Sequence, residues 1–167
     1  MRPFRFGALA QLGAHHTGSV GVTGSSPVCS MVVNINLYYQ GGALMKFFVC
    51  ETCGNFVEMI KESGAPMTCC GQKMKELVPG TSDGAVEKHV PVFKVEGNKV
   101  TVNVGSVEHP MVPEHYIEWI AIETAKGAQR KVLNPEEKPC AELLLTEGDS
   151  LVAVYAYCNL HGLWKAE

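Results

Sequence analysis

The chain has 167 residues, of which 14 are Lys or Arg and 17 are Asp or Glu; its net charge of −3 argues against a broad basic nucleic-acid-binding surface. With 46% apolar and 19% charged residues, its composition is that of a globular chain and not of a disordered one. No run of about 18 apolar residues occurs, which argues against a transmembrane helix.

The first 44 residues differ from the rest of the chain. They contain Arg2 and Arg5 but no acidic residue, and they show no helical period. A signal peptide needs an apolar stretch after its basic start, and Gln11, His15 and His16 interrupt any such stretch here. We therefore expect no export, and no membrane or nucleic-acid partner.

A different origin for this segment is suggested by its codons. Residues 8–13, 16–20 and 24–27 can be encoded by triplets that resemble, in that order, the D-arm, anticodon stem and T-loop of an alanine tRNA gene. We hypothesise that residues 1–44 are an unstructured extension from a start codon assigned too far upstream, and that Met45 is the true start. The genomic DNA tests this, because the codons must form a cloverleaf.

Cysteines are the first chemical signal in the remainder. The chain has seven, an odd number, which favours metal or redox chemistry over a disulfide scaffold. Cys50 and Cys53 form a C-x-x-C knuckle, and the adjacent pair Cys69 and Cys70 follows. Four thiolates on two short loops suit a tetrahedral site for zinc or iron, and spacing alone favours a structural zinc ribbon. The adjacent pair weakens that interpretation, because neighbouring cysteines cannot form a second standard knuckle.

The residues around these cysteines match a known module. The segments CETCGN (50–55) and TCCGQKM (68–74) resemble desulforedoxin, a small rubredoxin-like iron protein. The resemblance covers about residues 46–80 and implies a mononuclear iron centre with four cysteine ligands, Cys50, Cys53, Cys69 and Cys70. So short a piece has little room for a core, so metal ligation is expected to hold it together.

Beyond residue 84 the pattern changes to short β-branched runs. We expect strands at 90–95, 100–104, 116–122, 141–145 and 151–157, with a turn at 96–99, and so an antiparallel β-sandwich. Alternation along 116–122 places Glu118, Ile120 and Ile122 on one face and Ile117 and Trp119 on the other.

All four histidines beyond the extension lie in this half, together with a cysteine three positions before the last of them. Singly, each histidine is best explained as an ordinary surface or core residue. Together, four imidazoles and one thiolate are one ligand too many for tetrahedral zinc and one too few for a closed octahedron. The set suits iron with one open coordination position, and its members are His89, His109, His115, Cys158 and His161.

Four motifs in order carry a second resemblance. The segments DGAVEKHVPV (83–92), VGSVEHPM (104–111), HYIEWI (115–120) and YCNLHGLWK (157–165) resemble superoxide reductase. With the desulforedoxin-like segment in front, residues 46–167 as a whole resemble desulfoferrodoxin, the two-iron form. The resemblance implies an immunoglobulin-like sandwich of seven strands, with the four histidines as equatorial iron ligands and Cys158 as the axial one.

The same resemblance implies roles outside the ligand set. Lys88 would attract superoxide and help to stabilise the bound product, and Glu87 would close the sixth position in the oxidised form. One-electron reduction of superoxide to hydrogen peroxide leaves ferric iron, so an external donor is required. The family implies rubredoxin as donor, a homodimer, and the cytoplasm of an anaerobic or microaerophilic prokaryote. Cys29 and Cys140 have no role in the pattern, and Cys140 is most simply a spare thiol.

The expected organisation is therefore an extension at 1–44, a metal ribbon at 45–81 and a catalytic sandwich at 82–167. Three alternatives remain open. The chain could be an electron carrier whose two irons cycle without substrate chemistry, a structural zinc-ribbon protein, or a dismutase that also oxidises superoxide and needs no donor. Metal analysis separates the zinc protein from the iron proteins.

Overall fold

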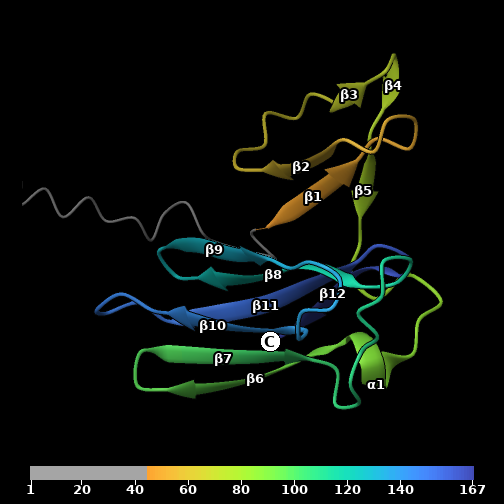
Figure 1. Ribbon diagram of the computed structural model, residues 1–167. Helices are drawn as coiled ribbons and strands as arrows, with labels where there is room; N and C mark the ends of the chain where they lie inside the picture. Colours follow the sequence, from red (N-terminus) through yellow and green to blue (C-terminus); the bar gives the residue numbers. More distant parts are fainter. Residues whose placement is uncertain (1–44) are drawn as a thin grey trace, which may run out of the picture. The chain divides into compact units, whose positions relative to one another are not determined.

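The computed structural model describes residues 45–167 (Figure 1). The expectations for residues 1–44, including those for Cys29, lie outside the described residues. Between Met45 and Glu167 no helix is long and apolar enough to cross a membrane.

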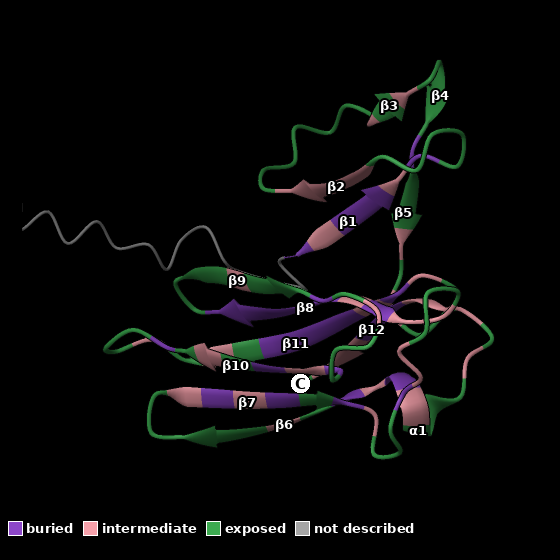
Figure 2. Cartoon of the chain, viewed as in Figure 1, coloured by how far each residue is buried: buried purple, intermediate pink, exposed green. Residues whose placement is uncertain are grey.

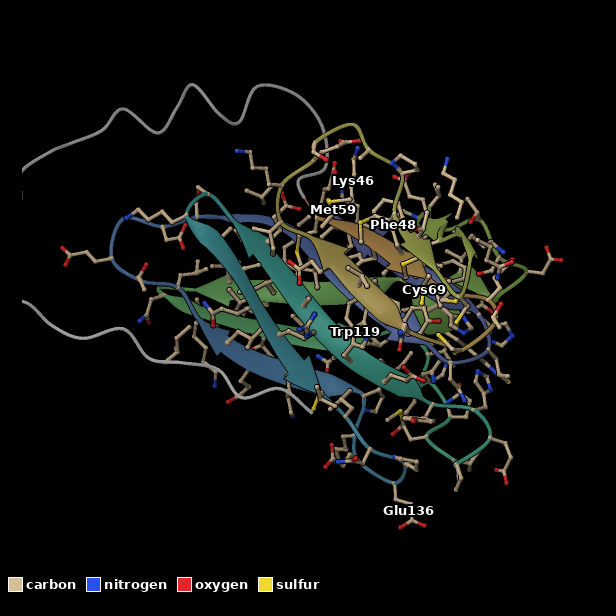
Figure 3. All side chains as sticks on the ribbon, turned by 90° about the horizontal axis from the view of Figure 1, so that it is seen from above. Lys46, Phe48, Met59, Cys69, Trp119 and Glu136 are labelled. Atoms are coloured by element: carbon tan, nitrogen blue, oxygen red, sulfur yellow. The ribbon has the colours of Figure 1, made fainter. Side chains whose placement is uncertain are left out.

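A small β-ribbon opens the described part. Its main sheet has the strand order β2-β1-β5, with both neighbours antiparallel to β1, and a separate two-stranded hairpin joins β3 and β4. The bounds of these strands are β1 Lys46–Val49, β2 Phe56–Met59, β3 Thr68–Cys69, β4 Gln72–Lys73 and β5 Lys75–Leu77. Phe48 and Cys69 share one small cluster with Cys50 and Met74 (Figure 3).

Seven strands form the rest of the fold, as the family resemblance implies. Three lie in a sheet of order β10-β7-β6 and four in a sheet of order β12-β11-β8-β9. They are β6 Pro91–Glu96, β7 Lys99–Val104, β8 Ile117–Thr124, β9 Gly127–Val132, β10 Cys140–Leu144, β11 Leu151–Cys158 and β12 Gly162–Ala166. A single-turn helix, α1 (Val86–His89), precedes β6.

The five strands expected from the sequence are all present, each within two residues of the expected bounds. The expected turn is a two-residue hairpin in which Glu96 pairs with Lys99, and Gly97 supplies the positive φ of 61° that such a turn needs. Strands β9 and β12 were not expected. Most of β9 is exposed and has no alternation to reveal it (Figure 2).

The inner faces of the two sheets form the sandwich core, with the longest buried runs on β8 and β11 (Figure 2). Burying these branched side chains contributes about 25 cal/mol per Å² of apolar surface removed from water. The fully or nearly fully buried members include Val100, Val102, Ile117, Ile120, Ile122, Val154 and Ala156.

A β-bulge interrupts the pairing of β8 with β11. Trp119 lies opposite Tyr157, but the next partner, Cys158, lies opposite Ile117, so Glu118 is the extra residue. Ile117 therefore joins the core cluster of Ile120 and Ile122. The alternation expected from the sequence holds from Trp119 onward and is wrong for Ile117, because the bulge reverses the face of the strand.

Aromatic side chains of the ribbon pack on the outer face of the four-stranded sheet. Phe47 has no exposed surface and contacts Trp119 at 5.0 Å and Tyr155 at 5.8 Å between ring centroids. Phe56 contacts Trp119 at 5.5 Å and Tyr157 at 5.0 Å (Trp119 is labelled in Figure 3). The ribbon thus gains apolar burial from the sandwich in addition to any metal it holds.

Candidate metal centres

The four cysteines of the ribbon converge on one point. Their sulfur atoms all lie within 4.8 Å of one another, with 3.6 Å between Cys53 and Cys69 and 3.9 Å between Cys69 and Cys70. A tetrahedron of sulfurs about 2.3 Å from a central metal has edges of about 3.8 Å. The donor set therefore fits one tetrahedral soft-metal ion.

Local backbone geometry explains how two adjacent cysteines can face the same centre. Cys70 has φ of 50° and Gly71 has φ of 78°, so the chain takes two successive left-handed residues. Such a conformation strains an ordinary residue such as Cys70 and suits Gly71. The sharp reversal turns both sulfurs inward, which overcomes the obstacle that the adjacent pair presented in the sequence.

Electrostatics at this site favour a cation. The backbone N–H groups of Cys53 and Thr52 lower the pKa of Cys50 to about 6. Its hydrogen-bonded neighbours Cys53 and Cys69 raise the pKa of Cys70 to about 12. The first thiolate therefore forms easily, while the last proton is held by the surrounding sulfurs. A bound metal ion removes that obstacle, because it stabilises all four thiolates at once. The Asn55 side chain also donates to Cys69 Sγ at 3.5 Å.

The second donor group lies at the end of the sandwich. It contains four histidines and one cysteine whose candidate ligand atoms all lie within 4.8 Å of one another. Helix α1 carries one histidine, the connection from β7 to β8 carries two, and the end of β11 with the turn after it carries the rest. The members are His89, His109, His115, Cys158 and His161, the five residues expected from the sequence.

Two backbone carbonyls fix the tautomers of the buried imidazoles. His89 Nδ1 donates to the Ala85 carbonyl at 2.8 Å, and His109 Nδ1 donates to the Pro110 carbonyl at 2.6 Å. A carbonyl only accepts, so the proton lies on Nδ1 and leaves Nε2 with a lone pair. This is how metal-bound histidines are commonly oriented.

The free ring nitrogens face one another. His89 Nε2 lies 3.0 Å from His161 Nδ1 and 3.1 Å from His109 Nε2, and His115 Nε2 lies 3.1 Å from His161 Nδ1. Four nitrogens at the corners of a square, each about 2.1 Å from a central ion, stand about 3.0 Å apart. Neighbouring rings are also nearly perpendicular, as His89 and His109 are at 78°. The arrangement fits four ligands in one plane.

Burial keeps these imidazoles ready to bind. Desolvation lowers the pKa of His109 to about 4, and it also lowers the pKa of His89 and His115. Neutral imidazole is the form that binds a metal, so burial favours binding. Cys158 is buried as well, and its Sγ lies 3.6 Å from His161 Nδ1. Burial raises the pKa of this thiol, so a metal ion is what stabilises it as a thiolate.

Several residues that the sequence did not reveal hold these ligands in place. Trp164 stacks on His89 with 4.9 Å between centroids, and its Nε1 donates to the His161 carbonyl at 2.9 Å. The Ser82 hydroxyl donates to the same carbonyl. Gly84 lies so close that a Cβ there would stand 3.2 Å from His89 Nδ1. Such contacts join residues far apart in the chain, so no local pattern of the sequence could have revealed them.

Asn159 ties two ligand loops together. Its Oδ1 accepts from the Tyr116 backbone N–H at 3.0 Å, and its Nδ2 donates to the Glu114 carbonyl at 3.1 Å. The loop that carries His115 is therefore fixed to the turn that follows Cys158. This arrangement preorganises the ligands from the two segments.

Glu87 and Lys88 lie on α1, directly before His89. The Glu87 carbonyl accepts from the Val107 N–H at 2.9 Å, while its side chain is exposed. Lys88 is half-buried and lines a hollow of about 490 Å³ together with His109, Glu108 and Lys138. After burial and neighbouring histidines, the charge of Lys88 also contributes to the lowered pKa of His115. The amine is thus close enough to act on the histidine group.

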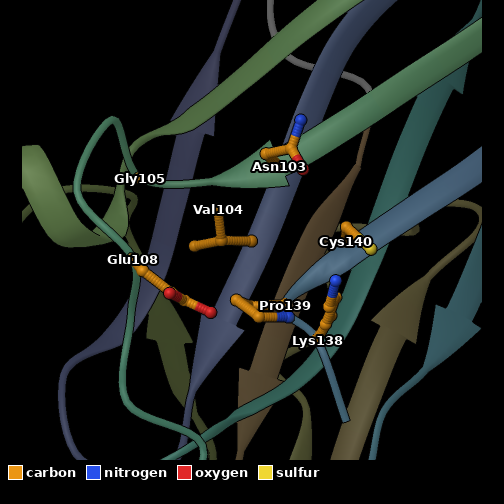
Figure 4. A pocket seen from close by; sticks show the side chains of 7 residues that line it. All are labelled: Asn103, Val104, Gly105, Glu108, Lys138, Pro139 and Cys140. Carbon is orange, nitrogen blue, oxygen red and sulfur yellow. The ribbon is translucent and has the colours of Figure 1, made fainter.

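Cys140 lies apart from both donor groups. It lines a pocket of about 210 Å³ with Asn103, Glu108 and Lys138, of which the last two also line the hollow at Lys88 (Figure 4). It is absent from both groups of clustered ligands among the described residues. Cys140 is the first residue of β10 and does not lie in the loop expected from the sequence; that it is a spare thiol stays a prediction.

The ribbon and the sandwich together define a metalloprotein with two mononuclear centres, one of sulfur donors alone and one of four imidazoles and a thiolate. Residues 81–167 match the desulfoferrodoxin family, and residues 43–77 match the desulfoferrodoxin N-terminal domain. The chain belongs to the desulfoferrodoxin family, whose two iron centres its two donor groups match.

Individual relatives agree with this assignment. The chain is 47% identical over 122 residues to the desulfoferrodoxin of Nitratidesulfovibrio vulgaris, covering 73% of this chain and 95% of that one. It is 46% identical over 123 residues to a desulfoferrodoxin homolog of Archaeoglobus fulgidus, covering 74% of this chain and 97% of that one. The crystal structure of the superoxide reductase from Treponema pallidum superimposes with a TM-score of 0.63 at 37% identity, covering 74% of this chain and 97% of that one.

Proposed function

We propose that this chain is a superoxide reductase, which reduces superoxide by one electron to hydrogen peroxide. The observation that carries the proposal is the second donor group: four imidazole nitrogens that face one another beside one buried thiol. Ferrous iron held there would supply the electron. The two protons needed to form hydrogen peroxide come from solvent.

The ligand roles follow from this geometry. His89, His109 and His115 would bind iron through Nε2, and His161 through Nδ1. Cys158 would hold the same iron through its sulfur, and a thiolate ligand donates electron density to the metal. The sulfur group of Cys50, Cys53, Cys69 and Cys70 would hold the first iron.

Lys88 and Glu87 act at the open face of the centre. The Lys88 ammonium attracts the superoxide anion into a protein whose net charge opposes its approach. Glu87 would supply a carboxylate to the ferric form of the centre: its side chain is exposed, while its backbone carbonyl accepts from the Val107 N–H. Neither residue is needed to bind the iron.

Turnover requires a partner, because each superoxide removes one electron. A small iron–sulfur carrier of the rubredoxin type fits that task. The family resemblance further supports a homodimer. We place the chain in the cytoplasm, where two sites that need reduced cysteines are maintained most easily, and where removal of superoxide serves oxidative-stress defence.

Stopped-flow mixing of the ferrous protein with superoxide tests the proposal. Without a donor, a reductase consumes one superoxide per catalytic iron and stops, and an added reductant restores turnover. A dismutase would continue without a donor, and an electron carrier would show no fast reaction at the sandwich. The zinc-loaded chain is the control, since zinc fills the sites and supplies no electron. Continued consumption without a donor would contradict the proposal.

A further inference from the structure

Glu118 lies at the bulge beside the thiolate. The partners on either side of it in β8, Ile117 and Trp119, face Cys158 and Tyr157 in β11. Residues opposite each other on antiparallel strands have Cα atoms roughly 4.5–5.5 Å apart. The extra residue is therefore a near neighbour of Cys158, and bulges of this kind are frequent beside active sites because they redirect a side chain.

The carboxyl group of Glu118 is unusual for its surroundings. It is half-buried, and it makes no hydrogen bond or ion pair with the residues that the structure describes. Burial raises its pKa. Other carboxylates of the fold have partners: Glu123 accepts from the Tyr155 hydroxyl at 2.8 Å, and Glu58 pairs with Arg130 at 3.2 Å. A desolvated carboxylate without a partner costs stability, so a structural role does not explain it.

The strand register brings Glu118 close to the thiol. The bulge places Glu118 between the two residues of β8 that pair with Tyr157 and Cys158. One carboxyl group therefore lies beside the residue that would bind the sandwich iron through its sulfur.

We propose that Glu118 tunes the reduction potential of the sandwich iron through Cys158. The inference rests on the proposed function, because it concerns the electron that iron gives to superoxide. A negative charge beside the thiolate favours the more positive ferric form and so lowers the potential. Glu118 does not touch the substrate. Its charge makes the ferrous centre a stronger reductant. The same charge makes re-reduction of the ferric centre by the electron donor less favourable.

Glu118→Gln tests this with little change of shape. A redox titration of the iron-loaded protein, followed by the absorption of the ferric centre, measures the midpoint potential. We expect the ferric-to-ferrous equilibrium to shift toward ferrous by roughly tenfold, which is about 59 mV upward for one electron. Glu118→Asp keeps the charge but withdraws it by one methylene, so it should give a smaller upward shift.

Glu147→Gln is the matched control. Glu147 is exposed in the turn before β11 and Cys158 ends that strand, so about 23 Å of extended chain separates them. The control loses the same unit of charge and should leave the potential unchanged. If Glu118→Gln lowered the melting temperature or metal content but matched the potential of Glu147→Gln, the residue would be structural and the proposal wrong.

The redox titration of the Glu118 variants can succeed or fail independently of the test of superoxide reduction. The potential is measured without superoxide, so it reports the influence of Glu118 whether or not the chain reduces superoxide. The stopped-flow reaction of the unmodified chain decides that other question. Should Glu118→Gln fail to fold, Glu118→Ala removes the same charge, and an unshifted potential in that variant would overturn the proposal on its own.

Discussion

The indole of Trp119 lies parallel to the ring of Tyr157, with an interplanar angle of 9° and 5.6 Å between centroids. Tyr157 directly precedes Cys158 in β11, and Trp119 lies opposite it in β8. Phe47 and Phe56 of the ribbon pack against this pair or its neighbours. One aromatic cluster thus supports the strand end that carries Cys158 and also anchors the ribbon.

Phe47→Ala should weaken that anchor. Removing a fully buried phenylalanine costs about 3–5 kcal/mol, because apolar contacts are lost and a cavity remains. Chemical denaturation followed by tryptophan fluorescence measures the loss, since Trp119 lies in the contact. Val132→Ala removes a side chain that is 67% exposed and should change little. Equal stability of the two variants would show that the ribbon does not depend on this packing.

Cys50→Ser should empty the ribbon site and leave the other intact. The two ligand groups share no residue, so metal analysis should fall from two irons per chain to one. Because Phe47 remains packed on Trp119, we expect the ribbon to stay attached and superoxide reduction to persist. Loss of both irons would mean that the sandwich cannot hold its metal alone.

Much of the site was predictable from the sequence, because ligand types and motif order are local properties. His89 and Cys158 could be assigned before their distance was known. The face of the strand on which Ile117 lies could not be predicted, because the bulge that sets it depends on the pairing of β8 with β11. Strand β9 gave no signal, since its residues are mostly exposed and do not alternate. Likewise, nothing in the chain indicated that Phe47 would meet Trp119, a contact between segments 72 positions apart.

Gly84→Ala should weaken iron binding at the sandwich without touching a ligand. The added Cβ would stand 2.7 Å from Trp164 Cζ2 and 3.2 Å from both His161 Cβ and His89 Nδ1. Two ligands and the ring stacked on one of them must move, and disturbing such supporting contacts commonly costs about 10–100-fold in metal affinity. Competition with a chelator measures this loss.

The control for that variant is Gly127→Ala. A Cβ at Gly127 meets nothing within 4 Å, and the ribbon iron should be retained in both variants. If Gly84→Ala held the sandwich iron as tightly as Gly127→Ala does, the close approach of Gly84 would have no part in shaping the site.

Lys88→Met should slow the capture of superoxide without removing iron. Lys88 lines the hollow beside His109 and acts electrostatically on His115. A local cation at an open metal site can raise the association rate of an anion by roughly 10-fold or more. Its reach is limited by screening to about 10 Å at 0.1 M salt. The rate of the unmodified protein should therefore fall as ionic strength rises, and the rate of the variant should fall less.

Two further variants isolate the position of the charge. Lys88→Arg retains the charge with a different hydrogen-bonding geometry, so it should recover much of the rate. Lys99→Met removes the same charge at the start of β7, where Lys99 pairs with Glu142 at 2.7 Å, and should leave the rate and its salt dependence close to those of the unmodified protein. Stopped-flow rates across a range of salt, with iron content measured in parallel, distinguish these cases. If Lys88→Met reacted as fast as Lys99→Met at every salt concentration, Lys88 would be only a solvated residue at the rim, and the steering role would fail.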